Sequence, residues 1–115
     1  MNIEIIREYC QGLIAATEDI KWGNDLVFSV GSKMFCVIGL DAPLGFSFKV
    51  DDEEFEHLVS QPGIIPAPYM ARAKWIRVGE EANMPAKEWK ERILHSYELV
   101  KAKLTKKLKV ELGLY

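Results

Sequence analysis

The stretch 65–78 constrains the fold more than any other part of the sequence. It opens with Pro66 and Pro68, each of which fixes its own φ at about −65° and disfavours helix at the residue before it. It closes with the run 75–78, which begins with Trp75 and alternates between two faces, as a strand does. The sequence therefore predicts a proline-locked loop that leads into a strand.

A β-hairpin is predicted upstream, with Gly31 and Ser32 as its two-residue connection. Strand-like runs at 26–30 and 33–40 flank this connection, and glycine at its first position favours a type II′ turn, which needs a positive φ there. The second run is apolar on both faces, which indicates a central strand. A third strand is predicted over 44–50.

Three helices are predicted around these strands. Apolar residues recur at spacings of three and four over 3–14 and again over 85–108, which predicts two amphipathic helices. Asp51 is expected to cap a short helix, with Glu54 three residues later completing a capping box. The segment 17–25 is expected to be a loop.

Together these elements predict an α+β fold. We expect one domain, residues 1–115, in which a four-stranded antiparallel sheet carries helices on one face in the order α-β-β-β-α-β-α. A chain of 115 residues, 49% of them hydrophobic, can bury a core without disulfides or a structural metal. Cys10 and Cys36 lie in apolar patterns, so both are expected to be buried free thiols.

The chain shows neither a secretory leader nor a membrane-spanning run. Its start carries Glu4 within a helical pattern, where a signal peptide would have a basic segment followed by an apolar one. No apolar run approaches the length that crosses a bilayer. We therefore expect a cytoplasmic protein.

Charge is distributed unevenly along the chain. Residues 1–66 contain 4 basic and 11 acidic side chains, whereas residues 67–115 contain 11 basic and 6 acidic ones. Such a division indicates either a surface for a polyanion or two halves that attract each other across the fold. The residues that would contact nucleic-acid phosphates are Arg72, Lys74 and Arg77 around Trp75, together with Lys103, Lys106 and Lys107. The acidic pI of about 5.7 counts against this hypothesis.

No catalytic motif is present in the sequence. His57 and His95 belong to no nucleophile motif, zinc-ligand spacing or phosphate-binding loop. The acidic run 51–56 is typical of a solvated helical turn, since a hard cation needs oxygen ligands spread over a turning backbone. We therefore expect a protein that is not an enzyme and that holds neither a cofactor nor a metal.

Aromatic residues provide a second functional hypothesis. A sheet with helices on one face leaves its other face open, and Trp22, Tyr69 and Trp75 are candidates to contact a small molecule or a protein there. The same aromatics would also suit a core, and for Trp75 we favour the core.

The order of the elements resembles the MmcQ/YjbR family of small bacterial proteins. The matching motifs are Lys49-Val50 before an acidic helix, Pro62-Gly63, Pro66-Ala67-Pro68-Tyr69, the Trp75 strand with Val78, a helix that opens at Pro85, and Ser96-Tyr97-Glu98-Leu99-Val100 with Leu104 to Lys107 behind it. The resemblance covers nearly the whole chain. One departure is Lys74, which stands before the tryptophan where such proteins often carry histidine.

The resemblance implies a fold similar to that of CyaY and frataxin, with an antiparallel sheet and helices on one face. It also implies DNA binding, which is our first functional hypothesis, and a ligand- or protein-binding sheet face is the alternative. An iron-binding role by analogy with frataxin would rest only on Glu4, Glu8, Asp19 and Asp25. Fold alone does not carry function, so this third hypothesis is the weakest.

Overall fold

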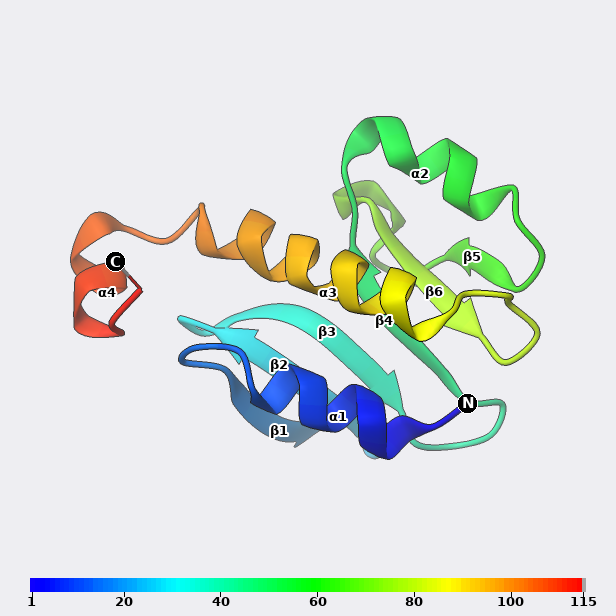
Figure 1. The fold of residues 1–115 in the computed structure, drawn as a ribbon, viewed down its shortest axis with the longest axis horizontal. Coiled ribbons are helices and arrows are strands. Elements are labelled where there is room, and N and C mark those ends of the chain that lie inside the picture. The colour runs from blue at the N-terminus through cyan, green and yellow to red at the C-terminus, as the bar shows by residue number, and fades with distance from the viewer. Residues whose placement is uncertain (115) are drawn as a thin grey trace.

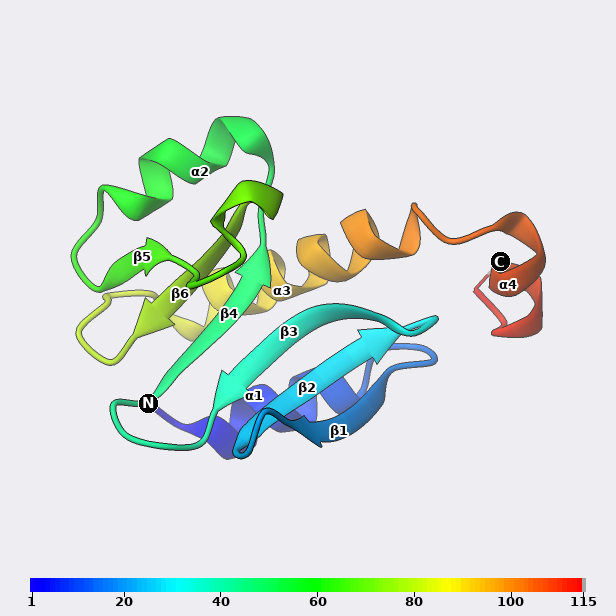
Figure 2. The same cartoon turned by 180° about the vertical axis from the view of Figure 1, so that it is seen from behind.

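The computed structural model describes residues 1–114 as one antiparallel sheet of six strands with helices on one face (Figure 1). The strand order is β1-β2-β3-β4-β6-β5. The elements are α1 (Ile3–Gln11), β1 (Thr17–Lys21), β2 (Asp25–Val30), β3 (Lys33–Gly39), β4 (Gly45–Lys49), α2 (Asp52–Val59), β5 (Ile64–Pro66), η1 (Ala71–Ala73), β6 (Trp75–Gly79), α3 (Ala86–Lys101) and α4 (Lys106–Glu111). Seen from behind, the strands lie in front of α1 and α3, so one face of the sheet carries no helix (Figure 2).

The α+β class and the single antiparallel sheet agree with the prediction, but the predicted count of four strands is wrong. The two missed strands are the edges of the sheet. All five residues of β1 are exposed, so its sequence shows no alternation of apolar and polar residues, and 17–25 was expected to be a loop. β5 has three residues and ends at Pro66, which is tolerated at an edge because proline has no N–H to donate.

The hairpin forms at the predicted residues but with a different turn. Gly31 and Ser32 have φ values of 56° and 67°, and a positive φ at both positions is typical of a type I′ connection. The pairing of β2 with β3 is irregular, because Phe28 pairs with Cys36 and the next residue of β2 pairs with Met34. Phe35 is therefore an extra residue of β3, and this bulge explains why the strand looked apolar on both faces.

The segment predicted as one helix over 85–108 forms two helices. α3 ends at Lys101, and α4 begins after Thr105. The hydroxyl of Thr105 accepts a hydrogen bond from the backbone N–H of Leu108 at 3.1 Å. Thr105 has extended backbone, as an N-cap residue does, so a continuous helix cannot pass through it. The break places Leu104 against the hairpin tip, where an added Cβ on Gly31 would lie 2.7 Å from its Cδ1.

The first two helices also differ from their predictions. α1 ends at Gln11, just before Gly12, and does not continue to residue 14. α2 begins after Asp51, but the carboxylate of Asp51 makes no capping hydrogen bond to the helix. It accepts a hydrogen bond from His95 Nε2 at 2.8 Å instead, so the predicted capping box is absent.

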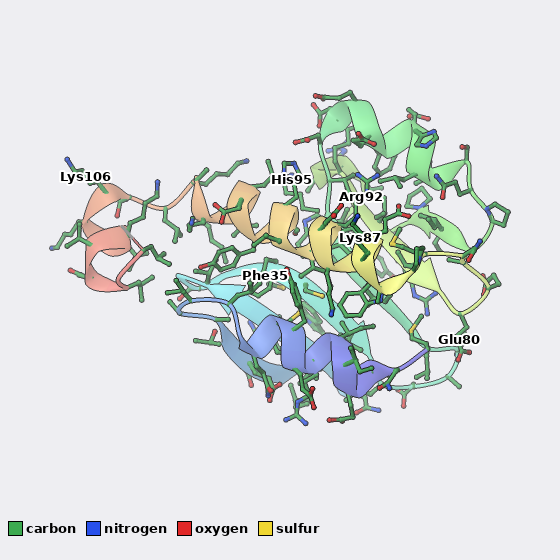
Figure 3. All side chains as sticks on the ribbon, in the orientation of Figure 1. Phe35, Glu80, Lys87, Arg92, His95 and Lys106 are labelled. Atoms are coloured by element: carbon green, nitrogen blue, oxygen red, sulfur yellow. The ribbon has the colours of Figure 1, made fainter. Side chains whose placement is uncertain are left out.

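Two apolar clusters hold the sheet. The larger one lies between the sheet and the helices, and Phe35 occupies it beneath α3 (Figure 3). The smaller one lies on the opposite face and consists of Val27, Val37, Ala67 and Trp75. Trp75 is only 5% exposed, so it belongs to the core.

Ser96 joins α3 to two strands. Its hydroxyl donates to the carbonyl oxygen of Phe35 at 2.7 Å and accepts from the backbone N–H of Lys49 at 3.0 Å. The side chain is fully buried. It therefore satisfies one backbone group at the bulge of β3 and another at the end of β4.

The predicted buried thiols are found as expected, since Cys10 and Cys36 are both free and fully buried. Among the helices of residues 1–114, none is long and apolar enough to cross a membrane.

Candidate ligand pocket on the open sheet face

The sheet face that carries no helix has a hollow of about 590 Å³. Small-molecule sites commonly have volumes of about 300–1,000 Å³. Its floor is formed by β3 and β4, and its walls by the β1–β2 turn, by β6 and by the loop 68–70. We call this hollow the open-face pocket.

The floor of the open-face pocket is low because its central positions lack side chains. Gly39 of β3 and Gly45 of β4 are cross-strand partners, and the next floor position of β4 is the small Ser47. A Cβ added to Gly39 would lie 3.7 Å from the carbonyl oxygen of Gly45, which is an ordinary contact, and its φ is not in the left-handed region. The backbone therefore does not require glycine at residue 39, and the missing side chain serves to leave space.

Arg77 extends along this floor from β6. Its guanidinium lies against the backbone of Gly45, where an added Cβ would be 2.5 Å from Cζ. Nη2 donates to the carbonyl oxygen of Pro43 at 2.7 Å. The guanidinium forms no ion pair with any carboxylate in the part of the chain that the structure describes. It is thus held in place at one nitrogen while its other N–H donors are available.

Asp25 provides a negative group on the other side of the floor. It is the cross-strand partner of Gly39, and its Oδ1 would lie 3.8 Å from a Cβ on that glycine. Its side chain is half-buried at the start of β2. The pocket therefore combines one cation and one anion on a floor in which two neighbouring positions are glycine.

Two exposed aromatic residues form the rim. Trp22 in the β1–β2 turn is 65% exposed, and Tyr69 in the loop before η1 is fully exposed. Both have left-handed backbone, with φ values of 51° and 67°. This conformation is disfavoured for bulky residues, and such strained positions cluster at binding sites.

The structure separates the residues that the sequence suggested for nucleic-acid binding. Arg72 is exposed on η1, Arg77 lines the open-face pocket, and Lys74 places its ammonium 4.8 Å from the ring centre of Phe55 in α2. The remaining three are the lysines 103, 106 and 107, which lie in the turn after α3 and on α4. Figure 1 shows α4 at the end of the molecule opposite to β5 and β6, and Lys106 is correspondingly far from Glu80 in Figure 3.

Of the aromatic candidates, the pocket brings together Trp22 and Tyr69, whereas Trp75 lies beneath it in the smaller core cluster. The acidic residues considered for iron lie on three different elements, α1, β1 and β2, and residues 1–114 contain no group of three potential metal ligands. Sequence reasoning considered Asp25 only for iron binding, and it missed the two floor glycines. The sequence signal that could have indicated the pocket is the pair Gly39 and Gly45, which stand on two consecutive strands joined by one loop.

Lys49 and Cys36 are among the groups outside the pocket whose pKa values are shifted. Burial lowers the pKa of Lys49, whose ammonium donates to the carbonyl oxygen of Ala73. A side-chain hydrogen bond with Cys10, together with burial, raises the pKa of Cys36 well above its usual value. A buried thiol of raised pKa is not a nucleophile at neutral pH.

Comparison with known proteins places the chain among small domains of the same architecture. The YjbR family model matches residues 11–99. The chain is similar to a Deinococcus radiodurans protein with a DUF419 domain, at 30% identity and a TM-score of 0.86, over 97% of this chain and 88% of that one. A Pseudomonas syringae protein is similar in its crystal structure at 25% identity and a TM-score of 0.73, over 87% of this chain and 99% of that one. A solution NMR structure of a protein from Pseudomonas syringae is also similar, at 25% identity and a TM-score of 0.69, over 87% of this chain and 93% of that one. No functionally curated protein matches the sequence.

Proposed function

The chain belongs to the YjbR family, and we propose that it binds a small ligand in the open-face pocket. Every residue that lines the pocket falls inside the segment that matches the family, between residues 22 and 77. The sequence alone favoured DNA binding over this alternative. We now rank ligand binding first, because one hollow gathers two exposed aromatics and two opposite charges, whereas the six predicted phosphate contacts do not all lie together.

The observation that carries the proposal is the glycine floor. Glycine inside a strand is unfavourable by roughly 0.5–1 kcal/mol relative to alanine, and it often marks a place where a ligand approaches the backbone closely. Alanine would fit at Gly39 by ordinary contacts. Glycine at residue 39 is therefore less stabilising than alanine would be, and its effect is to leave space above the strand for a ligand.

An NMR titration with a library of small fragments tests the proposal. Fragments that bind should shift the backbone amide signals of Gly39, Gly45 and Ser47 and the Nε signal of Arg77. Signals of α4, which is outside the pocket, should not move. If no fragment shifts the floor signals at millimolar concentration, the proposal is wrong.

Gly39→Ala provides a sharper test, because it fills the floor without disturbing the backbone. We expect unchanged stability or a gain of about 0.4–1 kcal/mol in urea unfolding, together with at least a several-fold loss of fragment affinity. Gly12→Ala is the matched control, since Gly12 also lacks a left-handed φ and a Cβ there would make an ordinary 3.5 Å contact. This control should bind fragments as the parent does. Undiminished binding by Gly39→Ala would contradict the proposal.

DNA binding is our second candidate function. It is supported by exposed basic residues that make no ion pair within residues 1–114, namely Arg72, Lys103, Lys106 and Lys107. The test is fluorescence anisotropy with labelled duplex and single-stranded DNA over a salt series. Phosphate contacts would give affinity that falls steeply with salt, with a slope of about −0.9 per contact for a duplex.

Two sets of alanine variants locate such contacts without touching the pocket. One replaces Arg72 and Lys74, and the other replaces the three lysines 103, 106 and 107. A shallower salt slope in either variant would support DNA binding on that surface. Absence of binding at low salt would eliminate this candidate.

We further propose that the protein is a binding protein and not an enzyme. The pocket lining contains neither histidine nor cysteine, which are common catalytic bases and nucleophiles. The frataxin-like arrangement and the cytoplasmic location implied at the sequence level stay predictions.

A further inference from the structure

We propose that the ligand of the open-face pocket is a small aromatic zwitterion with the chemistry of an aromatic α-amino acid. This inference rests on the proposed function and names the class of its ligand. The carboxylate would bind Arg77, the ammonium would bind Asp25, and the ring would lie between Trp22 and Tyr69. Each of these three contacts follows from a separate feature of the pocket.

Arg77 is suited to a carboxylate. A guanidinium presents its N–H donors in a planar fork that matches the two oxygens of a carboxylate. Here one nitrogen is already bonded to the carbonyl oxygen of Pro43, and the plane rests against Gly45. The group is therefore held in position before a ligand arrives, which reduces the entropy lost on binding.

Asp25 is suited to an ammonium, and its position relative to Arg77 suits an amino acid headgroup. Neighbouring strands are about 4.8 Å apart, and the carboxylate stands beside Gly39 while the guanidinium stands over Gly45, one strand away. The two groups do not pair directly, since no ion pair within 4.0 Å joins them. The two groups therefore stand over neighbouring strands and more than 4.0 Å apart, so a headgroup that carries both charges can lie between them and contact each one.

The rim is suited to an aromatic ring. Trp22 and Tyr69 come from two separate loops and border the same hollow, where they are among the most exposed apolar side chains of the chain. Each occupies a backbone conformation that costs on the order of 1–3 kcal/mol for a residue of its size. Stacking against a ligand ring is the interaction that would use both side chains at once.

The same features argue against other occupants. A neutral planar compound would leave both charges without partners. A phosphate or a DNA backbone would meet the carboxylate of Asp25, which repels anions on the same floor. The pairing of one cation with one anion therefore favours a molecule that carries both charges.

Three probes that share a phenyl ring test this inference. L-phenylalanine has both charges, 3-phenylpropionate has only the carboxylate, and phenethylamine has only the ammonium. NMR titration of the pocket signals gives a dissociation constant for each probe. We expect L-phenylalanine to bind at least about fivefold more tightly than either analogue, since a charge-assisted contact in a partly open pocket contributes at least that much.

Two variants that each remove one charge assign the contacts. Asp25→Asn should weaken the binding of L-phenylalanine and phenethylamine and leave 3-phenylpropionate unchanged. Arg77→Gln should weaken L-phenylalanine and 3-phenylpropionate and leave phenethylamine unchanged. Glu53→Gln and Arg72→Gln are the matched controls, because both side chains are exposed and lie outside the pocket lining. The amide spectrum of each variant reports whether its fold is intact.

The outcomes separate the inference from the proposed function. Equal binding of the three probes at the pocket, or loss of all three with Asp25→Asn in a folded variant, would overturn the zwitterion and leave the pocket as a ligand site. If neutral fragments shift the pocket signals but none of these three probes does, the zwitterion is likewise overturned and the pocket remains a ligand site. If neither the probes nor the fragment library shift the floor signals, the proposed function fails as well.

Discussion

Replacing Ser96 with alanine should destabilise the protein far more than the loss of one small hydroxyl suggests. The hydroxyl is fully buried and connects the carbonyl oxygen of Phe35 with the backbone N–H of Lys49. Alanine fits the same space, so no steric strain arises. The substitution instead leaves two backbone groups without their partner, and one of them lies at the bulge where the strand ladder is interrupted.

The magnitude follows from the burial of these two groups. An orphaned buried hydrogen-bonding group costs about 1–3 kcal/mol. The hydrogen bond to Phe35 is buried and the bond from Lys49 is only partly so, which places the second contribution near the lower limit. We therefore expect a loss of about 2–4 kcal/mol, a large part of the roughly 5–15 kcal/mol that stabilises a typical domain.

Urea unfolding measures this loss, and Ser60→Ala is a matched control. The hydroxyl of Ser60 also donates to a carbonyl oxygen at 2.7 Å, that of His57, but it does so on the exposed surface. Water can replace that partner, so the control should lose less than about 0.5 kcal/mol. If Ser96→Ala loses no more than Ser60→Ala, the argument from buried unsatisfied groups is refuted.

Three further substitutions test other parts of the structure. Gly63→Ala should cost more than about 2 kcal/mol in urea unfolding, because Gly63 has a φ of 81° and a Cβ there would lie 2.4 Å from the backbone nitrogen of Ala82. Glu18 has its pKa lowered from 4.5 by its hydrogen bond and attraction to Arg7, so this pair contributes stability that is present above pH 4.5 and is lost as pH falls through the lowered pKa. Glu18→Gln should therefore make the decline of stability between neutral pH and pH 3 shallower, whereas an unchanged profile would exclude the pair as its cause. Trp22→Asn should keep or raise the melting temperature, since the side chain is 65% exposed and asparagine tolerates a left-handed φ, and a clear fall would show that Trp22 contributes packing.

The four inner strands were predictable from the sequence. The predicted runs 26–30, 33–40, 44–50 and 75–78 each end within one residue of β2, β3, β4 and β6. These strands are largely buried, so they are rich in apolar residues, and such runs are visible in the residue order. The edge strands are exposed or too short to require any pattern, which is why both were missed.

The helix break and the turn type had no comparable signal. The apolar stripe of 85–108 continues through the break at regular spacing, because Leu104 is buried by the hairpin tip and not by a continuing helix. Type I′ and type II′ turns both accept glycine first, so the left-handed φ of Ser32 was not evident.

The candidate site was predictable in its parts and not as a whole. The sequence analysis named Trp22 and Tyr69 as candidate contacts for a ligand on the open sheet face. It assigned Arg77 to the DNA-binding hypothesis instead. Only the register of β3, β4 and β6 shows that they border one hollow. The floor glycines were not singled out, since absent side chains carry meaning only when their neighbours are known.

The glycine floor has a consequence for how this fold can diversify. The backbone N–H and C=O groups of β3 and β4 are engaged in the sheet ladder, so the floor supplies shape and almost no chemistry. Discrimination between ligands must then come from the two rim loops and from the side chains of Asp25 and Arg77. Because these loops contribute little to the larger core, a lineage can exchange one ligand for another by changing a few rim residues while the sheet and helices stay as they are.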